Sequence, residues 1–220
     1  MTAPTEHTER DPVVRTVEWI KKNQRLLIIV ATLVVGSIAA VMFMRVSSAR
    51  EENFANSLLS NARAVAASGN TALAITDLSD LVMRHRGTIA AEEAEIMLAR
   101  LRLSEGQGEA AVQALQDYIG SGPSDQFRAA AYGLLGVALE QTVNLRDAAA
   151  AYENAAAEAW YDFLSAQYLL DAGRVLTTAG DSTRAIATYQ RIIDELAETD
   201  MVMEARLRLG ELQRADIDSR

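Results

Sequence analysis

Cysteine is absent from this chain of 220 residues. Disulfides, thiolate metal sites, cysteine nucleophiles and lipidation of an N-terminal cysteine are therefore excluded. Proline and phenylalanine are scarce, with three and four residues, and alternating runs of β-branched residues are missing after residue 50. Because alanine is abundant at the same time, the composition favours an all-helical chain.

Groups that carry chemistry are also few. Histidine occurs only as His7 and His85, and neither has a nearby group with which it would form a catalytic pair. The sequence contains no phosphate-binding glycine loop, dinucleotide fingerprint, zinc pattern or nucleophile elbow. We therefore predict a protein that is not an enzyme and that uses no cofactor, metal or small-molecule substrate.

Positive charge is in short supply over most of the chain. Residues 51–220 carry 14 Arg and Lys against 26 Asp and Glu, whereas residues 1–50 carry seven against four. An acidic domain repels the phosphates of nucleic acids, so nucleic acid is not an expected partner.

One long apolar run is present near the N-terminus. The nineteen residues from Leu26 to Met44 include no charged side chain, and a helix of this length spans about 28 Å, close to the hydrocarbon thickness of a bilayer. We predict a single transmembrane helix over residues 26–44. A buried core helix and a signal peptide cleaved after Ala49 are the alternatives, and the long leader with acidic residues disfavours the second.

Basic residues flank this run unevenly, with five before it and three after it. They are Arg10, Arg15, Lys21, Lys22 and Arg25, followed by Arg45, Arg50 and Arg63. This bias predicts a cytoplasmic N-terminus and a C-terminal domain on the other side of the membrane; the reverse orientation is the alternative. Residues 1–25 are predicted to form a leader with a short interfacial helix near Trp19, and residues 45–54 a helical connector.

Beyond the run, five segments repeat at a spacing of 37 residues. Small residues form one column, Ala62, Ala99, Gly136, Gly173 and Gly210, and alanines form another, Ala74, Ala111, Ala148 and Ala185. A third column is bulky: Leu78, Leu115, Tyr152 and Tyr189. A fixed period of this length predicts stacked helical hairpins, which build elongated binding surfaces rather than buried catalytic pockets.

Each repeat divides at a turn that carries Gly69, Gly106, Val143 or Gly180. Glycine closes a helix in the left-handed conformation, and the Asn or Asp that follows can cap the next helix. We expect the small residues to let the two helices of a hairpin approach closely, with Gly136 meeting Ala148. The bulky column is expected to fill the gap toward the neighbouring hairpin.

These residues resemble the tetratricopeptide repeats. The resemblance is carried by Tyr132, Leu135, Gly136, Ala148, Tyr152 and Ala155, and in the next unit by Gly173, Gly180, Asp181, Ala185, Ile186 and Tyr189. It implies a tetratricopeptide-like α-solenoid over residues 55–220 that ends in a capping helix. The period departs from the usual spacing of about 34 residues.

The order of charged leader, Val17-to-Asn23 stretch, apolar span and repeats resembles a narrower group, the bacterial single-span ancillary subunits of the Sec translocon. The resemblance implies a protein of the cytoplasmic (inner) membrane with a periplasmic domain. Its partners would be the translocon, periplasmic chaperones and exported chains. A self-associating scaffold that coordinates envelope or division machinery is the alternative, and the oligomeric state stays open.

Two sets of residues are candidates for contact with a partner protein. The first helices of stacked hairpins line the concave surface, where the column Arg63, Arg100 and Arg174 lies with Leu59, Ile96 and Leu170. Arginine binds carboxylates through paired hydrogen bonds, so such a groove would hold an acidic segment or a chain terminus. The alternative is that these arginines pair with local carboxylates such as Glu93 or Asp171.

The second set is the aromatic cluster of Trp160 and Tyr161, with Phe163 just beyond. Trp and Tyr dominate the energetics of protein interfaces, so an exposed cluster would anchor a partner. The alternative is that the cluster packs a long link against the solenoid.

Overall fold

The computed structural model describes Trp19 and residues 21–218, and the predicted interfacial helix of the leader falls almost entirely outside the described residues. Within this range the chain forms helices and no strand, which confirms the all-helical prediction. Contacts divide the chain into two units, Met1–Arg50 and Glu51–Arg220.

Helix α2 (Gln24–Ala67) contains the apolar run, the predicted connector and the first helix of the repeats. Its side chains from residue 32 to residue 50 are exposed. A segment of it, Thr32–Ala67, passes the criteria of length and composition for crossing a membrane. The N-terminal part of α2 therefore has the character of a membrane span or of a signal anchor.

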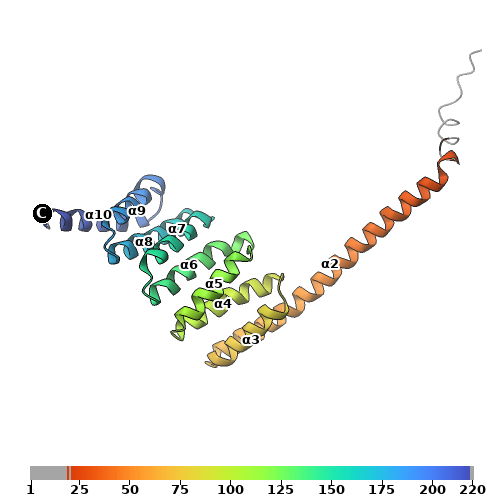
Figure 1. The fold of residues 1–220 in the computed structure, drawn as a ribbon, viewed down its shortest axis with the longest axis horizontal. Coiled ribbons are helices and arrows are strands. Elements are labelled where there is room, and N and C mark those ends of the chain that lie inside the picture. The colour runs from red at the N-terminus through yellow and green to blue at the C-terminus, as the bar shows by residue number, and fades with distance from the viewer. Residues whose placement is uncertain (1–18, 20, 219–220) are drawn as a thin grey trace, which may run out of the picture. The chain divides into compact units, whose positions relative to one another are not determined.

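The second unit is built from helical hairpins that stack in sequence order (Figure 1). The C-terminal part of α2 pairs with α3 (Thr71–Arg84), α4 (Ile89–Ser104) with α5 (Gly108–Gly120), α6 (Asp125–Gln141) with α7 (Leu145–Glu158), and α8 (Asp162–Thr178) with α9 (Ser182–Glu195). A last helix, α10 (Met201–Asp218), packs on α8 and α9. This arrangement confirms the predicted solenoid with a terminal helix.

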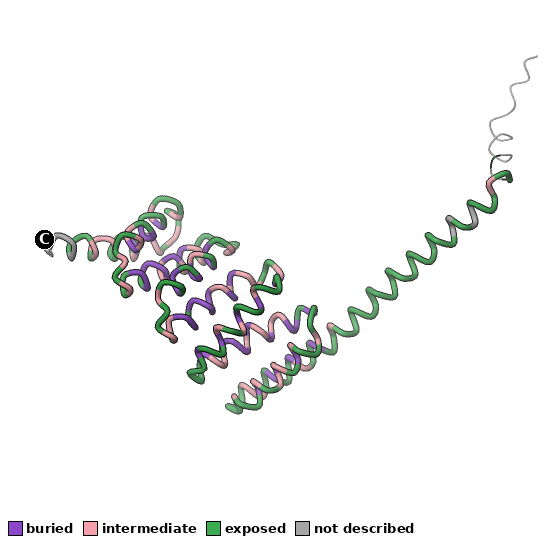
Figure 2. Tube along the Cα trace, in the orientation of Figure 1, coloured by how far each residue is buried: buried purple, intermediate pink, exposed green. Residues whose placement is uncertain are grey.

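The core follows the facing sides of these helices, as Figure 2 shows in purple. One buried cluster joins the end of α2 to α3 and α4, and a second runs from α4 to α10. Alanine supplies many of its fully buried positions, among them Ala74, Ala111, Ala148 and Ala185. Small side chains allow the helix backbones to pack closely along both clusters.

The two tyrosines of the bulky column contact their own hairpin, whereas the prediction placed the column toward the neighbouring one. A Cβ atom on Gly136 would lie 2.7 Å from Cε1 of Tyr152, and one on Gly173 would lie 2.5 Å from Cε1 of Tyr189. Each tyrosine ring therefore lies on the glycine of its own hairpin. The nearest side chain to Gly136 belongs to Tyr152 and not to Ala148, because the ring occupies the space that the missing Cβ leaves.

A different glycine lies at the contact between hairpins. A Cβ atom on Gly133 of α6 would lie 2.5 Å from Cε1 of Tyr168, which belongs to α8. The tyrosine of one hairpin thus packs against the backbone of the preceding hairpin. Gly133 stands in the column of Leu59, Ile96 and Leu170, where it replaces a large side chain, and the 37-residue pattern did not reveal its contact with Tyr168.

The turns within the hairpins confirm the predicted helix ends. The backbone φ angle is positive at Gly69 (87°), Gly106 (72°) and Gly180 (75°), and also at Val143 (60°). The side chains of Asn70 and Asp181 accept hydrogen bonds from the backbone N–H three residues on, at 3.3 and 3.2 Å. Asn144 makes no such cap and instead donates to the Thr142 hydroxyl.

Candidate protein-binding surfaces

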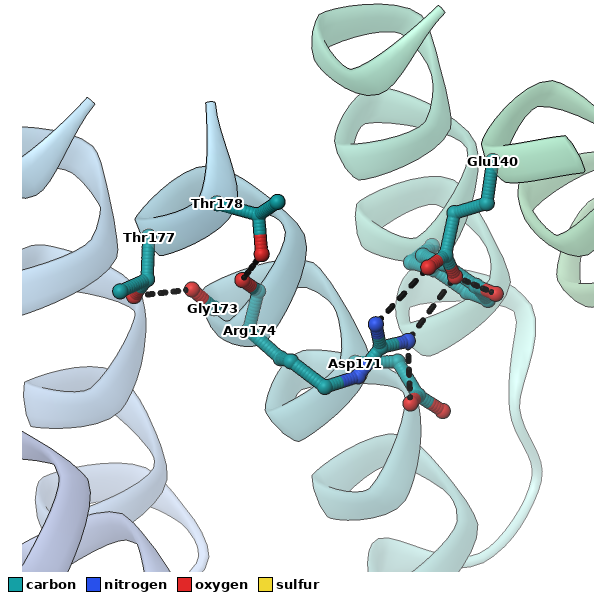
Figure 3. A network of polar contacts seen from close by, with 7 residues as sticks. Glu140, Asp171, Gly173, Arg174, Thr177 and Thr178 are labelled. Atoms are coloured by element: carbon teal, nitrogen blue, oxygen red, sulfur yellow. Dashed lines mark hydrogen bonds and ion pairs between the residues drawn. The ribbon is translucent and has the colours of Figure 1, made fainter. Parts of the chain in front are cut away.

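Two arginines of the predicted groove bind carboxylates on neighbouring hairpins. Arg63 on α2 pairs with Glu93 on α4. Arg174 on α8 donates to Glu140 on α6, with Nη1 to Oε2 at 2.8 Å and Nη2 to Oε1 at 2.9 Å. Arg174 also donates to Asp171 at 3.1 Å (Figure 3). Arg63 and Arg174 therefore follow the alternative, pairing with Glu93 and with Asp171, and the pairs with Glu93 and Glu140 link successive first helices.

Glu140 is the centre of this network. Its Oε1 atom also accepts a hydrogen bond of 2.6 Å from the hydroxyl of Tyr152. Burial alone would raise the pKa of the Glu140 carboxyl, but the hydrogen bonds from Arg174 and Tyr152 outweigh burial and lower it. Burial, followed by the hydrogen bond to Glu140, raises the pKa of the Tyr152 hydroxyl. Glu140 is therefore ionised and joins the third hairpin to the fourth.

A second ion pair joins the same two hairpins through their outer helices. Arg184 on α9 donates through Nη2 to both carboxylate oxygens of Glu153 on α7, at 3.1 and 3.0 Å. Because Arg174 and Arg184 reach back from both helices of the fourth hairpin, its position on the third is fixed by charge as well as by packing.

The prediction that three apolar residues line the groove is wrong for two of them. Leu59 and Ile96 are buried, with 1% and 6% of their surface exposed. Each lies three residues before a member of the small column, Ala62 or Ala99, and residues three apart share one face of a helix. They consequently face the core. Leu170 is half-buried.

Arg100 is exposed, as are Arg63 and Arg174, but it differs from them in its partners. Among the described residues, no carboxylate lies within ion-pair distance of it. Burial raises the pKa of the Tyr168 hydroxyl, and the positive charge of Arg100 opposes this rise. Arg100 thus shares a surface with Tyr168 and is the arginine of this column that remains open to an acidic group of a partner.

The aromatic cluster is exposed. Trp160, Tyr161 and Phe163 keep 67%, 61% and 55% of their surface accessible. The rings of Tyr161 and Phe163 stack with their centroids 5.7 Å apart. These residues occupy the link between α7 and α8 and the start of α8. They do not pack the link against the solenoid, so the structure retains them as candidates for an anchor.

A stack of helical hairpins with exposed surfaces on its helices and links defines an α-solenoid of the protein-interaction class. The chain belongs to the tetratricopeptide repeat-like domain family, whose sequence profile matches residues 17–214. The match begins before the apolar run and ends within α10, so the anchor-like helix is part of the family pattern.

Solved structures share the fold. MamA from Desulfovibrio magneticus RS-1, in a form that starts at its residue 41, has a TM-score of 0.52 and 20% identity, over 66% of this chain and 76% of that one. A putative kinesin light chain from Podosopora anserina, with nearly identical TPR-like repeats, has a TM-score of 0.59 and 16% identity, over 74% and 87%. A search of curated protein sequences finds no match to the chain.

Proposed function

We propose that this protein is a membrane-anchored adaptor of the bacterial cell envelope that binds other proteins and catalyses no reaction. The observation that carries the proposal is the exposed aromatic cluster of Trp160, Tyr161 and Phe163. Leaving three large rings in water is unfavourable for an isolated domain, whereas Trp and Tyr are the residues that most often anchor protein interfaces.

The more specific role is that of an ancillary translocon subunit that works with periplasmic chaperones on exported proteins. The apolar part of α2 and the excess of basic residues before it support a single span with a cytoplasmic N-terminus and a periplasmic repeat domain. The family fold supports protein partners. Arg100 supplies a second contact point, for an acidic group.

Photocrosslinking in intact membranes tests this role. The full chain carries a photoreactive amino acid in place of Trp160, and a matched variant carries it in place of Val143, which is 76% exposed but belongs to a tight turn. We expect discrete adducts with a translocon subunit or a periplasmic chaperone from position 160 and none from position 143. Adducts only with a second copy of the chain would replace this role with the self-associating scaffold.

Orientation is tested separately by a reporter that is active only in the periplasm, fused after Arg220. A periplasmic C-terminus predicts reporter activity. Loss of activity in a fusion that is made and inserted in the membrane would remove the translocon role, because the repeats would then face the cytoplasm.

A further inference from the structure

A cavity of about 570 Å³ opens where the end of α3, the start of α4 and the end of α5 meet. Its volume falls within the range of about 300–1,000 Å³ that is typical of ligand sites. Three carboxylates line it, those of Glu92, Glu95 and Asp117, against one guanidinium, that of Arg86. Val82, Ala91 and Pro123 add apolar walls. The cavity lies apart from the arginine column and from the aromatic cluster.

Glu92 forms a fixed wall of the cavity. Its Oε2 atom accepts hydrogen bonds from the Tyr118 hydroxyl at 3.1 Å, from the Ser124 backbone N–H at 2.9 Å and from the Ser124 hydroxyl at 2.6 Å. These three donors tie the end of α5 and the start of α6 to α4. Because Glu92 is held in place, the cavity is a built feature and does not depend on a mobile side chain.

Glu95 is different, because no described side chain or backbone group donates a hydrogen bond to it or forms an ion pair with it. Burial raises the pKa of its carboxyl, and the charges of Arg102 and Arg86 only oppose this rise from a distance. A carboxylate taken partly out of water without a partner is costly, and a cation that enters the cavity offsets that cost.

We propose that this cavity binds the side chain of an arginine or lysine in an extended segment of a partner protein. The proposal rests on the adaptor function and names the chemistry of one of its partners. Glu95 and Asp117 provide the negative charge, and Val82 and Pro123 provide surface for the methylene stem of the side chain. No described group of acidic or histidine side chains is suited to a metal ion, and the cavity is larger than an ion needs.

The probe is a short capped peptide of glycine, alanine and serine with one central arginine, titrated into the full chain in detergent micelles. A matched peptide carries glutamine at the centre, and free arginine amide is a third ligand. We expect the arginine peptide to bind more tightly than both. Binding of the free amide as tight as that of the peptide would assign the cavity to small amines and overturn the proposal.

Variants of the chain locate the binding. Glu95→Gln should lower the affinity for the arginine peptide about tenfold, because one charge-assisted hydrogen bond is lost. Arg86→Gln should strengthen it, because a competing positive charge is removed. The control is Glu109→Gln, an exposed carboxylate on α5 outside the cavity, which should leave the affinity unchanged. Thermal unfolding of each variant verifies that it is folded.

Equal effects of Glu95→Gln and Glu109→Gln, or no effect of either, would overturn the site. This failure is distinguishable from failure of the adaptor function. If Trp160 captures its partners equally well in the Glu95→Gln background and the peptide result is negative, the function stands without the cavity. If the peptide binds as expected and position 160 captures nothing, the cavity stands without that function.

Discussion

The first two hairpins and the next two solve the same packing problem with different side chains. In the first two, the small and bulky columns pair Ala62 with Leu78 and Ala99 with Leu115, whereas the third pairs Gly136 with Tyr152. The fourth hairpin repeats the Gly and Tyr pair. All of these residues are buried. Glycine in place of alanine removes a methyl group from the small position, and tyrosine in place of leucine adds a ring at the large position. The two changes compensate, so the combined volume of the pair is conserved.

The larger side chain brings a polar requirement that the smaller one lacks. The Tyr152 hydroxyl donates to Glu140, twelve residues earlier. At the same distance before Tyr189 stands Thr177, whose hydroxyl donates to the Gly173 carbonyl. The corresponding positions of the first two hairpins hold Ala66 and Leu103. Tyr152 thus comes with a polar partner, and Glu140 extends its network to the next hairpin.

The largest expected effect comes from removing a tyrosine ring. Tyr152→Ala should lower the free energy of unfolding by about 3–5 kcal/mol, because it opens a cavity against Gly136 and takes a donor from Glu140. Leu115→Ala should lower the free energy of unfolding by less than Tyr152→Ala does, within the range of about 2–5 kcal/mol. Denaturant unfolding followed by circular dichroism measures both. Equal costs would show that the two kinds of hairpin do not differ in this respect.

The ion pairs give a smaller contrast. Arg174→Met should lower the free energy of unfolding by about 1–2 kcal/mol, because Glu140 loses two hydrogen bonds, although solvent screens the half-exposed guanidinium. Arg63→Met should cost about 0–1 kcal/mol, since both partners of that pair are about half exposed. A larger loss for Arg63 than for Arg174 would reverse the contrast.

The same network predicts a pH dependence. The pKa of Glu140 is lowered in the folded chain, so its stabilisation is present above the ordinary value of 4.5 and is lost as pH falls through the folded value. The difference in unfolding free energy between the wild type and Glu140→Gln should be constant at neutral pH and shrink below about pH 4.5. A difference that grows on acidification would contradict the assignment.

The smallest effect concerns the turns. Val143 has a positive φ angle where the other three hairpin turns have glycine, and a β-branched residue is strained there by about 1–2 kcal/mol. Val143→Gly should therefore stabilise the chain by about 0.5–1 kcal/mol, part of the strain relief being lost to the entropy of glycine. Gly106→Val is the matched reverse change and should destabilise. Thermal unfolding with opposite signs for the two variants is the expected result.

The sequence was sufficient to predict the hairpins because their period, small columns and turn glycines are local signals. The register of the repeat also placed Val143 at a turn, but it did not predict the positive φ angle of that residue. The direction in which Tyr152 points was not predictable. A repeating pattern shows that a bulky residue is buried, but it does not show whether the side chain packs on its own hairpin or on the next one. The burial of Leu59 and Ile96 was missed although their spacing from the small column indicates the core face.

The candidate surfaces were less accessible to sequence reasoning. Arg63 and Arg174 each form an ion pair with a residue of a neighbouring hairpin, 30 and 34 positions away in the sequence. These pairs depend on side-chain geometry that periodicity does not encode. The cavity beside Glu95 likewise depends on three helix ends that meet in space. Exposure of Trp160 was one of two alternatives, and only packing decides between them.

The most direct test of the account is an exchange of one pair for the other in the third hairpin. Gly136→Ala alone should destabilise by about 1–3 kcal/mol, because its Cβ atom meets the Tyr152 ring, and Tyr152→Leu alone should also destabilise. The double variant recreates the pair of the second hairpin, so the stability that it loses should be smaller than the sum of the two single losses by at least about 1 kcal/mol. Strictly additive losses would contradict the claim that each hairpin is held together by matched small and large side chains.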